Sequence, residues 1–265
     1  MREWNAHSYH QVSTPQYDWG TTVLERLPLA GDEVVFDIGC GTGRLTERLL
    51  ERLPRGRVVA IDLSFNMLET ASRFLRPRFG HRVQLVMADA SLLPAVDTAD
   101  AIFSTATFHW VLDHPRLFRG LHASLRPGGQ IVAQCGGGPN IARLHERAAA
   151  LMREPSFAPH FTSWQEPWEF ADADITARRL EQAGFTDIRT SLVAAPVLQP
   201  DFDAFRTFIT TVICRPHLAH LPDPLLQDAF VRDLTEFASN DDPPFELDYW
   251  RLNIEARRPT ERRAG

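Results

Sequence analysis

The sequence has no block of basic residues and no long apolar run. The formal net charge of −6 provides no electrostatic footprint for a phosphate backbone, which argues against nucleic acid as a partner. No run approaches the roughly 20 apolar residues of a membrane span, and the first twenty residues are too polar for a secretory signal. We therefore expect a cytoplasmic protein, a monomer or homodimer, that acts on a small-molecule substrate and binds neither nucleic acid nor membrane.

Cysteines are also few. The chain has three, Cys40, Cys135 and Cys214, widely spaced and without a C-x-x-C pair. This odd set neither frames disulfides nor supplies a zinc cluster, so free thiols are expected. His217 and His220 form H-x-x-H, but no nearby Cys or paired carboxylate completes a set of ligands. We expect no bound metal, and we interpret these histidines as packed or solvated.

Short apolar runs rich in Val and Ile recur along the first half of the chain. They cover residues 33–39, 57–63, 83–90, 99–106 and 130–136. Such runs suit strands covered on both faces, and most gaps between them have the periodicity of amphipathic helices. This alternation predicts an α/β fold built on a parallel sheet.

Beyond residue 138 the pattern changes. A helix expected near residues 141–153 is followed by a loop rich in Pro, Phe and Trp, which we interpret as a lid over residues 154–170. Residues 198–242 have helical periodicity interrupted by prolines, and alternation returns near the end of the chain. The predicted units are an N-terminal lid helix (1–30), a core (31–197), a helical cap insertion (198–242) and a final core strand (243–257).

Three glycines lie between the first predicted strand and the first predicted helix. The spacing is Gly39-x-Gly41-x-Gly43, with Asp37 just before the turn. Glycines here can take positive φ and let the backbone approach a ligand closely. A merely tight strand-to-helix connection would also explain them, and a dinucleotide site would favour the spacing G-x-G-x-x-G.

Two acidic residues follow the next two predicted strands. Asp62 ends the second strand, where a carboxylate can accept hydrogen bonds from both hydroxyls of a ribose. Asp89 follows the third strand, where it would stand beside an adenine. Because the carboxyl ends of parallel strands share one edge of the sheet, these acids and the glycine turn indicate one ligand crevice. A nicotinamide-dependent oxidoreductase would share the turn and Asp62, but would not explain Asp89.

The stretches VVFDIGCGTG, VVAIDLS, VQLVMADA and LRPGGQIV resemble the successive motifs of class I S-adenosylmethionine-dependent methyltransferases. The resemblance covers roughly residues 4–138. It implies a Rossmann-like, doubly wound sheet of seven mostly parallel strands, with the strand at residues 245–257 inserted antiparallel. It also implies methyl transfer, with S-adenosyl-L-methionine as the cofactor.

Within that superfamily the opening residues and the stretch TATFHWVLDHPRLF are similar to the trans-aconitate methyltransferase-like group. The resemblance implies cofactor contacts at the methionine end from Asp37, Gly39, Cys40, Gly41 and Gly43, at the ribose from Asp62 and Leu63, and at the adenine from Asp89, Ala90 and Met67. It further implies contacts from Tyr9 and Gln16 on a covering helix, from Thr105, and from Trp110 at the acceptor. For Met67, ordinary helix core is an equal alternative.

The acceptor side of the site contains one candidate base, His109. A hydroxyl, amine or carbon acceptor benefits from a base, whereas a carboxylate is already nucleophilic. His109 could instead shape the pocket wall or accept a structural hydrogen bond. Trp164 offers an apolar wall, and Arg206 and Arg215 could pair with an acidic substrate, although most arginines on such helices face water.

We therefore expect a methyltransferase of small or medium organic molecules, with O-methylation of a carboxylate as the first choice. Two alternatives stay open at this stage. One is O-, N- or C-methylation of a natural product or other metabolite, because similar segments around His109 and Trp110 occur with other acceptors. The other is a protein that binds S-adenosylmethionine without catalysis, since every nucleotide motif would be retained in it.

Overall fold

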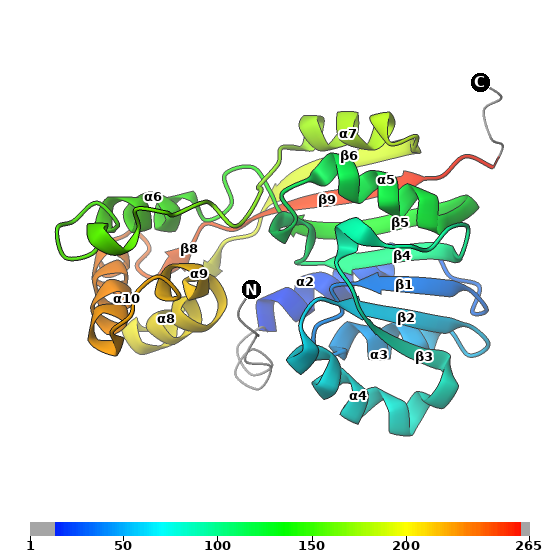
Figure 1. Ribbon diagram of the computed structural model, residues 1–265, viewed down its shortest axis with the longest axis horizontal. Helices are drawn as coiled ribbons and strands as arrows, with labels where there is room; N and C mark the ends of the chain where they lie inside the picture. Colours follow the sequence, from blue (N-terminus) through cyan, green and yellow to red (C-terminus); the bar gives the residue numbers. More distant parts are fainter. Residues whose placement is uncertain (1–13, 261–265) are drawn as a thin grey trace.

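The computed structural model describes residues 14–260, which form a sheet flanked by helices and a separate helical cap (Figure 1). The seven-stranded sheet has the order β3-β2-β1-β4-β5-β9-β6. The strands are β1 (Val34–Ile38), β2 (Arg57–Asp62), β3 (Val83–Met87), β4 (Ala99–Thr105), β5 (Leu125–Gly136), β6 (Thr186–Ala194) and β9 (Trp250–Arg257). Strand β9 lies antiparallel between β5 and β6, and the other pairings within this seven-stranded sheet are parallel. The predicted fold and the inserted antiparallel strand are confirmed.

Helices cover both faces of the sheet, which explains why its central strands β1, β2 and β4 are mostly apolar. They are α2 (Thr14–Glu25), α3 (Arg44–Arg52), α4 (Phe65–Phe79), α5 (His114–Ser124) and α7 (Ala173–Gln182), with short 3-10 turns η1 (Gly80–Arg82), η2 (Ala90–Leu92) and η3 (Phe108–Trp110). Leu117 and Leu180 bury α5 and α7 against one face, in the same cluster as Ile38. Val23 and Leu49 bury α2 and α3 against the opposite face.

The cap has its own apolar core. Its elements are α6 (Ala142–Leu151), η4 (Ala158–His160), β7 (Val197–Leu198), α8 (Phe202–Phe208), the π-helical turn η5 (Ile209–Ile213), α9 (Arg215–Leu218), α10 (Pro224–Ser239) and β8 (Glu246–Leu247). Leu144 of α6 and Phe157 pack in one cluster with Phe205, Phe230 and Leu247. The cap therefore draws on α6 and the aromatic loop as well as the predicted insertion, and residues 243–249 belong to it rather than to the final strand. Helical periodicity shows that α6 has an apolar face, but not which partner covers it.

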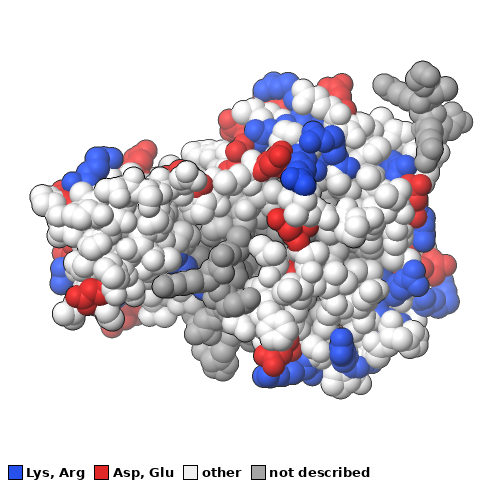
Figure 2. Space-filling model, in the orientation of Figure 1, with Lys and Arg blue, Asp and Glu red and all other residues white. Residues whose placement is uncertain are grey.

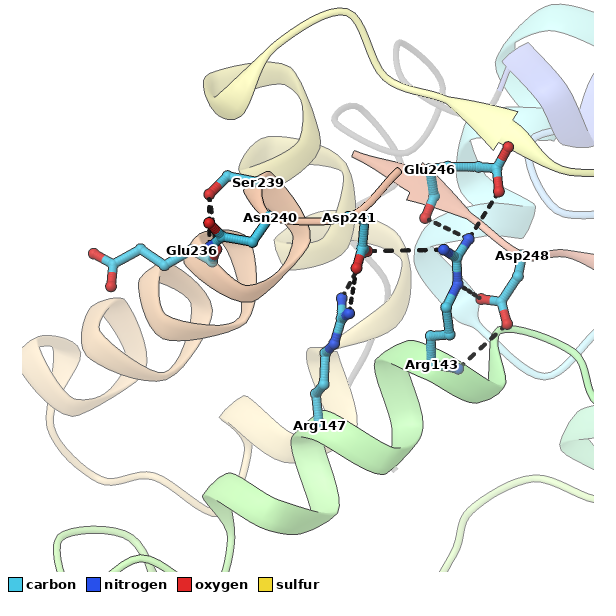
Figure 3. Close-up of polar contacts among 8 residues, drawn as sticks. All are labelled: Arg143, Arg147, Glu236, Ser239, Asn240, Asp241, Glu246 and Asp248. Atoms are coloured by element: carbon cyan, nitrogen blue, oxygen red, sulfur yellow. Dashed lines mark hydrogen bonds and ion pairs between the residues drawn. The ribbon is translucent and has the colours of Figure 1, made fainter. Parts of the chain in front are cut away.

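Arginines of α6 join this helix to the segment between α10 and β9, within the cap (Figure 3). The guanidinium of Arg147 donates to both carboxylate oxygens of Asp241, one of them at 2.8 Å. One turn earlier, Arg143 donates to Glu246 at 2.8 Å and lies 3.7 Å from a carboxylate oxygen of Asp248. The hydrogen bonds from Arg147 hold the pKa of Asp241 below its ordinary value.

Asp241→Asn should lower the free energy of unfolding by about 1–3 kcal/mol, because the charge-assisted bonds from Arg147 weaken. The pKa of the Asp241 carboxyl is lower in the folded state than in the unfolded state. Its contribution to the free energy of unfolding is therefore complete above the pKa of the unfolded state, and is lost as the pH falls through the pKa of the folded state. Urea unfolding at pH 7 measures the change. Glu69→Gln, which removes an exposed i,i+4 pair with Arg73, should cost about 0.5 kcal/mol or less. An equal decrease in the free energy of unfolding in the two variants would contradict a structural role for the hydrogen bonds between Arg147 and Asp241.

On the face shown in Figure 2, acidic and basic side chains are interspersed over the sheet portion, and much of the visible cap is uncharged. Within residues 14–260, no helix has the length and apolar character needed to cross a membrane. All three cysteines are buried free thiols.

Candidate functional site

The glycine turn after β1 is fastened to the end of β2. The N–H groups of Gly39 and Cys40 donate to the carbonyl of Ile61 at 2.7 and 3.0 Å. The N–H of Gly41 donates to one carboxylate oxygen of Asp62 at 2.8 Å, and the N–H of Ser64 donates to the other at 2.8 Å. Two backbone donors thus orient the Asp62 carboxylate at the carboxyl edge of the sheet.

Two of the glycines are required for different reasons. A Cβ on Gly39 would lie 1.9 Å from Oγ1 of Thr107, so this position must stay bare for the loop after β4 to pack. A Cβ on Gly41 would meet nothing within 4 Å, although its φ of +54° also favours glycine. The turn is therefore open above Gly41, where a ligand can approach the backbone. Gly43 is the N-cap of α3.

Asp37 on β1, just before this turn, and Gln16 on α2 each have a buried polar atom. Asp37 is 2% exposed and accepts a hydrogen bond from Oγ1 of Thr46 at 2.6 Å. Burial raises the pKa of Asp37 to about 7, opposed by the Thr46 hydrogen bond and reinforced by the carboxylate of Asp62. On α2, Oε1 of Gln16 is buried without a hydrogen-bond partner among the described residues. Unsatisfied buried oxygens are rare, and this one is available to a ligand's donor.

The ends of β2 and β3 expose apolar side chains beside an acid. Leu63 is 46% exposed and Met87, which the sequence did not single out, is 62% exposed. Asp89 accepts bonds from the N–H and hydroxyl of Ser91, both at 2.8 Å, and caps η2, which begins at Ala90. Exposed apolar side chains grouped beside a fixed carboxylate suit the flat face and polar edge of a purine.

Two further predicted cofactor residues are less exposed. Met67 is 3% exposed on α4, which is compatible with ordinary helix core. Cys40 is 8% exposed, and burial raises the pKa of its thiol. Thr105 ends β4, where its carbonyl accepts a bond from Oγ1 of Thr107 at 2.9 Å. Tyr9 lies outside the described residues.

His109 lies in η3, where the loop after β4 meets the end of β5. Its Nδ1 accepts a hydrogen bond from the N–H of Gly136 at 3.3 Å, and its ring stacks on Phe170 with centroids 5.6 Å apart. Its carbonyl accepts a bond from the N–H of Glu169 at 2.8 Å, which docks the predicted lid loop on this edge. Burial, followed by the positive charge of Arg251, lowers the pKa of His109 to about 3.

Arg251 is a site residue that sequence reasoning missed. It opposes Gly136 in the register of β9 with β5, and is 4% exposed. Its Nε donates to Gln134 at 3.4 Å, and its guanidinium lies 4.7 Å from the ring centroid of Trp19 on α2. The alternation along β9 placed Arg251 opposite the apolar face, but nothing in the sequence indicated that α2 covers that side.

A cluster of rings joins the cap to this edge; we call it the ring cluster. Its members are Trp110, His145, Phe161, Trp164, Trp168, Phe170 and His217. The ring centroids of Trp110 and Trp164 each lie 6.1 Å from that of Trp168, so the two predicted substrate residues belong to the same aromatic wall. The ring of His217 stacks on Trp164 with centroids 4.6 Å apart, which is the packed alternative of its sequence interpretation.

The two predicted substrate arginines lie within the cap. Arg206 of α8 is paired with Asp228 of α10, beside a cavity of about 470 Å³ that none of the cofactor-motif residues lines. Arg215 is partly buried on α9, and burial lowers its pKa. The ion pair of Arg206 with Asp228 lies within the cap, and a role for either arginine in binding the substrate stays a prediction.

His217→Phe should make the protein less sensitive to acid. Burial, followed by the charges of His145 and His220, lowers the pKa of His217 to about 3. The contribution of the neutral His217 ring to the free energy of unfolding is therefore complete above the pKa of the unfolded state, near 6.5. It is lost as the pH falls below that value, because the unfolded state then binds the proton more readily. The wild type should therefore lose up to about 2–3 kcal/mol more than the variant between pH 7 and 4.5. Urea unfolding at both pH values tests this, with the exposed His81→Phe as the control. An equal loss in all three proteins would contradict the assignment.

Comparisons with known proteins identify the family of this chain. Residues 35–129 match the family model of a methyltransferase domain. The chain is 31% identical over 195 residues to a trans-aconitate 2-methyltransferase of Methylobacterium nodulans, covering 74% of this chain and 69% of that protein. It is 32% identical over 158 residues to a malonyl-[acyl-carrier protein] O-methyltransferase of Xylella fastidiosa, covering 58% of this chain and 53% of that protein. The match thus spans about half to two thirds of these relatives.

The fold has solved counterparts as well. A putative methyltransferase of Bacillus halodurans superposes with a TM-score of 0.64 at 15% identity, over 91% of this chain and 99% of that one. The chain belongs to the class I S-adenosylmethionine-dependent methyltransferases, in the group related to trans-aconitate 2-methyltransferase. The family and the cofactor predicted from the sequence are confirmed. The open turn at Gly41, the buried Oε1 of Gln16 and the exposed Leu63 and Met87 fit that cofactor.

Proposed function

We propose that the protein transfers the methyl group of S-adenosylmethionine to a carboxylate oxygen of a small organic acid. The observation that carries this proposal is the position of Arg251, which is 4% exposed and lies beside the carboxyl end of β5. Its positive charge helps to lower the pKa of His109. A guanidinium pairs with a carboxylate through two parallel hydrogen bonds, and such pairs are strongest where water is excluded. The names of the two relatives, both methyltransferases of acids, support the same class of acceptor.

In this proposal the residues at the edge of the sheet hold the cofactor. Asp62 and Leu63 would bind the ribose, Asp89, Ala90 and Met67 would border the adenine, and Asp37, Gly39, Cys40, Gly41, Gly43, Thr105, Gln16 and Tyr9 would surround the amino-acid end. When bound, S-adenosylmethionine supplies an electrophilic methyl carbon, whose bond to sulfur breaks as the bond to the acceptor oxygen forms. The electron pair of the broken bond stays on sulfur.

The acceptor would lie between this edge and the ring cluster. Arg251 would hold its carboxylate, while Trp110 and Trp164 would exclude water, so that alignment supplies most of the rate enhancement. The ionised carboxylate needs no base. This mechanism therefore suits a site in which burial keeps His109 neutral.

A screen of acceptors tests the proposal. Wild-type protein is incubated with methyl-labelled S-adenosylmethionine and panels of di- and tricarboxylic acids, phenols and amines, and the labelled products are counted. We expect label in the acid panel and release of that label by alkali, as for a methyl ester. Label in phenols or amines alone would replace the proposal with another O- or N-methyltransferase. Cofactor binding in calorimetry without transfer to any panel would favour the non-catalytic alternative.

The location in the cytoplasm, the monomeric or homodimeric state and the absence of nucleic-acid partners stay predictions. Size-exclusion chromatography with light scattering measures the oligomeric state directly. The domain boundaries likewise stay a proposal, in which the cap extends to residues 141–170 and 195–249.

A further inference from the structure

We propose that His109 is a hydrogen-bond donor to the acceptor and not a general base. This inference rests on the proposed function, because it assigns to His109 the second oxygen of the carboxylate that Arg251 holds. The observation behind it is the contact between Nδ1 of His109 and the backbone N–H of Gly136 at 3.3 Å.

That contact fixes the tautomer. A backbone N–H can only donate, so Nδ1 must present its lone pair to Gly136. A neutral imidazole carries one proton, which then lies on Nε2. His109 consequently has no lone pair left with which to accept a proton from a substrate, and its remaining ring nitrogen is a donor.

The surroundings of His109 keep the ring neutral. The charged and titratable groups around it are Arg251 on β9, His114 on α5, Cys135 on β5 and Glu169 in the docked loop. Glu169 is engaged by Arg179 at 2.7 Å, and Nε2 of His114 lies 3.0 Å from the carbonyl of Phe108. Burial and the charge of Arg251 outweigh the rest, and the pKa of His109 falls to about 3.

The orientation of the ring is fixed as well. Phe170 stacks on one side at an interplanar angle of 28°, and Trp110 lies 5.2 Å away. A donor held in this way selects acceptors with an oxygen that is already ionised or strongly polarised. Phenols and alcohols need a partner that removes a proton, which His109 in this tautomer does not provide.

Three variants separate a donor from a base. His109→Gln places an amide N–H near the position of Nε2 and should retain kcat/KM for the acid within about threefold of wild type. His109→Asn, whose amide reaches only the position of Nδ1, and His109→Ala should lose about 10- to 150-fold, the worth of a hydrogen bond to a charged group. Between pH 5 and 9, no ionisation of His109 should appear in kcat/KM of the wild type. Equal loss in Gln and Ala, or a wild-type limb near pH 6.5 that disappears in Ala, would overturn the inference.

A second measurement does not depend on turnover. In protein labelled with ¹⁵N-histidine, the His109 signal, identified by its absence in His109→Gln, should show a protonated Nε2 and an unprotonated Nδ1 from pH 5 to 8. A protonated Nδ1 would contradict the donor role even if acids are methylated. Conversely, failure of the acid panel with an Nε2–H tautomer would overturn the choice of acceptor and leave the tautomer standing.

Discussion

Asp62→Ala is expected to weaken the binding of S-adenosylmethionine by about 10- to 150-fold, or roughly 1.5–3 kcal/mol. The substitution removes the carboxylate that would accept from the ribose hydroxyls. It also removes the acceptor for the N–H groups of Gly41 and Ser64, which hold the glycine turn at the end of β2. Calorimetric titration with the cofactor and with its demethylated product measures the loss.

Two variants serve as controls for Asp62→Ala. Asp62→Asn keeps one acceptor oxygen and should fall between wild type and Ala. Glu69→Ala removes an acid from the exposed face of α4, and should leave affinity unchanged. Unchanged affinity in Asp62→Ala would refute the ribose assignment. An equal loss in Glu69→Ala would show that general charge, and not the position of Asp62, is responsible.

Arg251→Gln is expected to lower kcat/KM for the acid by about 30- to 4,000-fold, corresponding to roughly 2–5 kcal/mol for breaking a buried charge pair. Arg251→Lys keeps the charge but loses the planar fork, so it should recover only part of the rate. Thermal unfolding of both variants shows whether the contacts with Gln134 and Trp19 also matter for folding.

Arg206→Gln provides the comparison for Arg251, because its guanidinium is engaged by Asp228 in the cap. We expect kcat/KM to change by less than about threefold, as is usual for an exposed ion pair. A large loss for Arg206→Gln with none for Arg251→Gln would restore the sequence-based proposal. If Arg251→Gln weakens the binding of the cofactor and leaves KM for the acid unchanged, then Arg251 anchors the cofactor instead.

The cofactor side of the site could be predicted from the sequence because it is built from local geometry. Gly39, Gly41, Asp62 and Asp89 each follow a strand, and parallel strands bring their carboxyl ends to one edge. The prediction that the last strand is inserted antiparallel came from the family resemblance. Alternation of polar and apolar residues shows which side chains share a face of a strand, but not which strands lie next to it.

The acceptor side could not be predicted in the same way. His145, Trp168 and His217 come from a helix, a loop and another helix, and they meet only because the cap folds onto its own apolar core. In the sequence, Arg251 has the position of a residue on the polar face of an ordinary strand. Its burial depends on α2, which lies more than 200 residues away in sequence. Contacts of this kind depend on tertiary packing, which periodicity does not describe.

The chemical position of the transferred methyl group shows most directly whether the protein methylates a carboxylate oxygen. Wild-type protein is supplied with S-adenosylmethionine carrying a ¹³C-methyl group and with the best acid from the screen, and the product is examined by carbon NMR and mass spectrometry. We predict a single added methyl, bonded to oxygen as an ester and released as labelled methanol by alkali. A label bonded to nitrogen or carbon, or one that alkali does not release, would contradict O-methylation of a carboxylate.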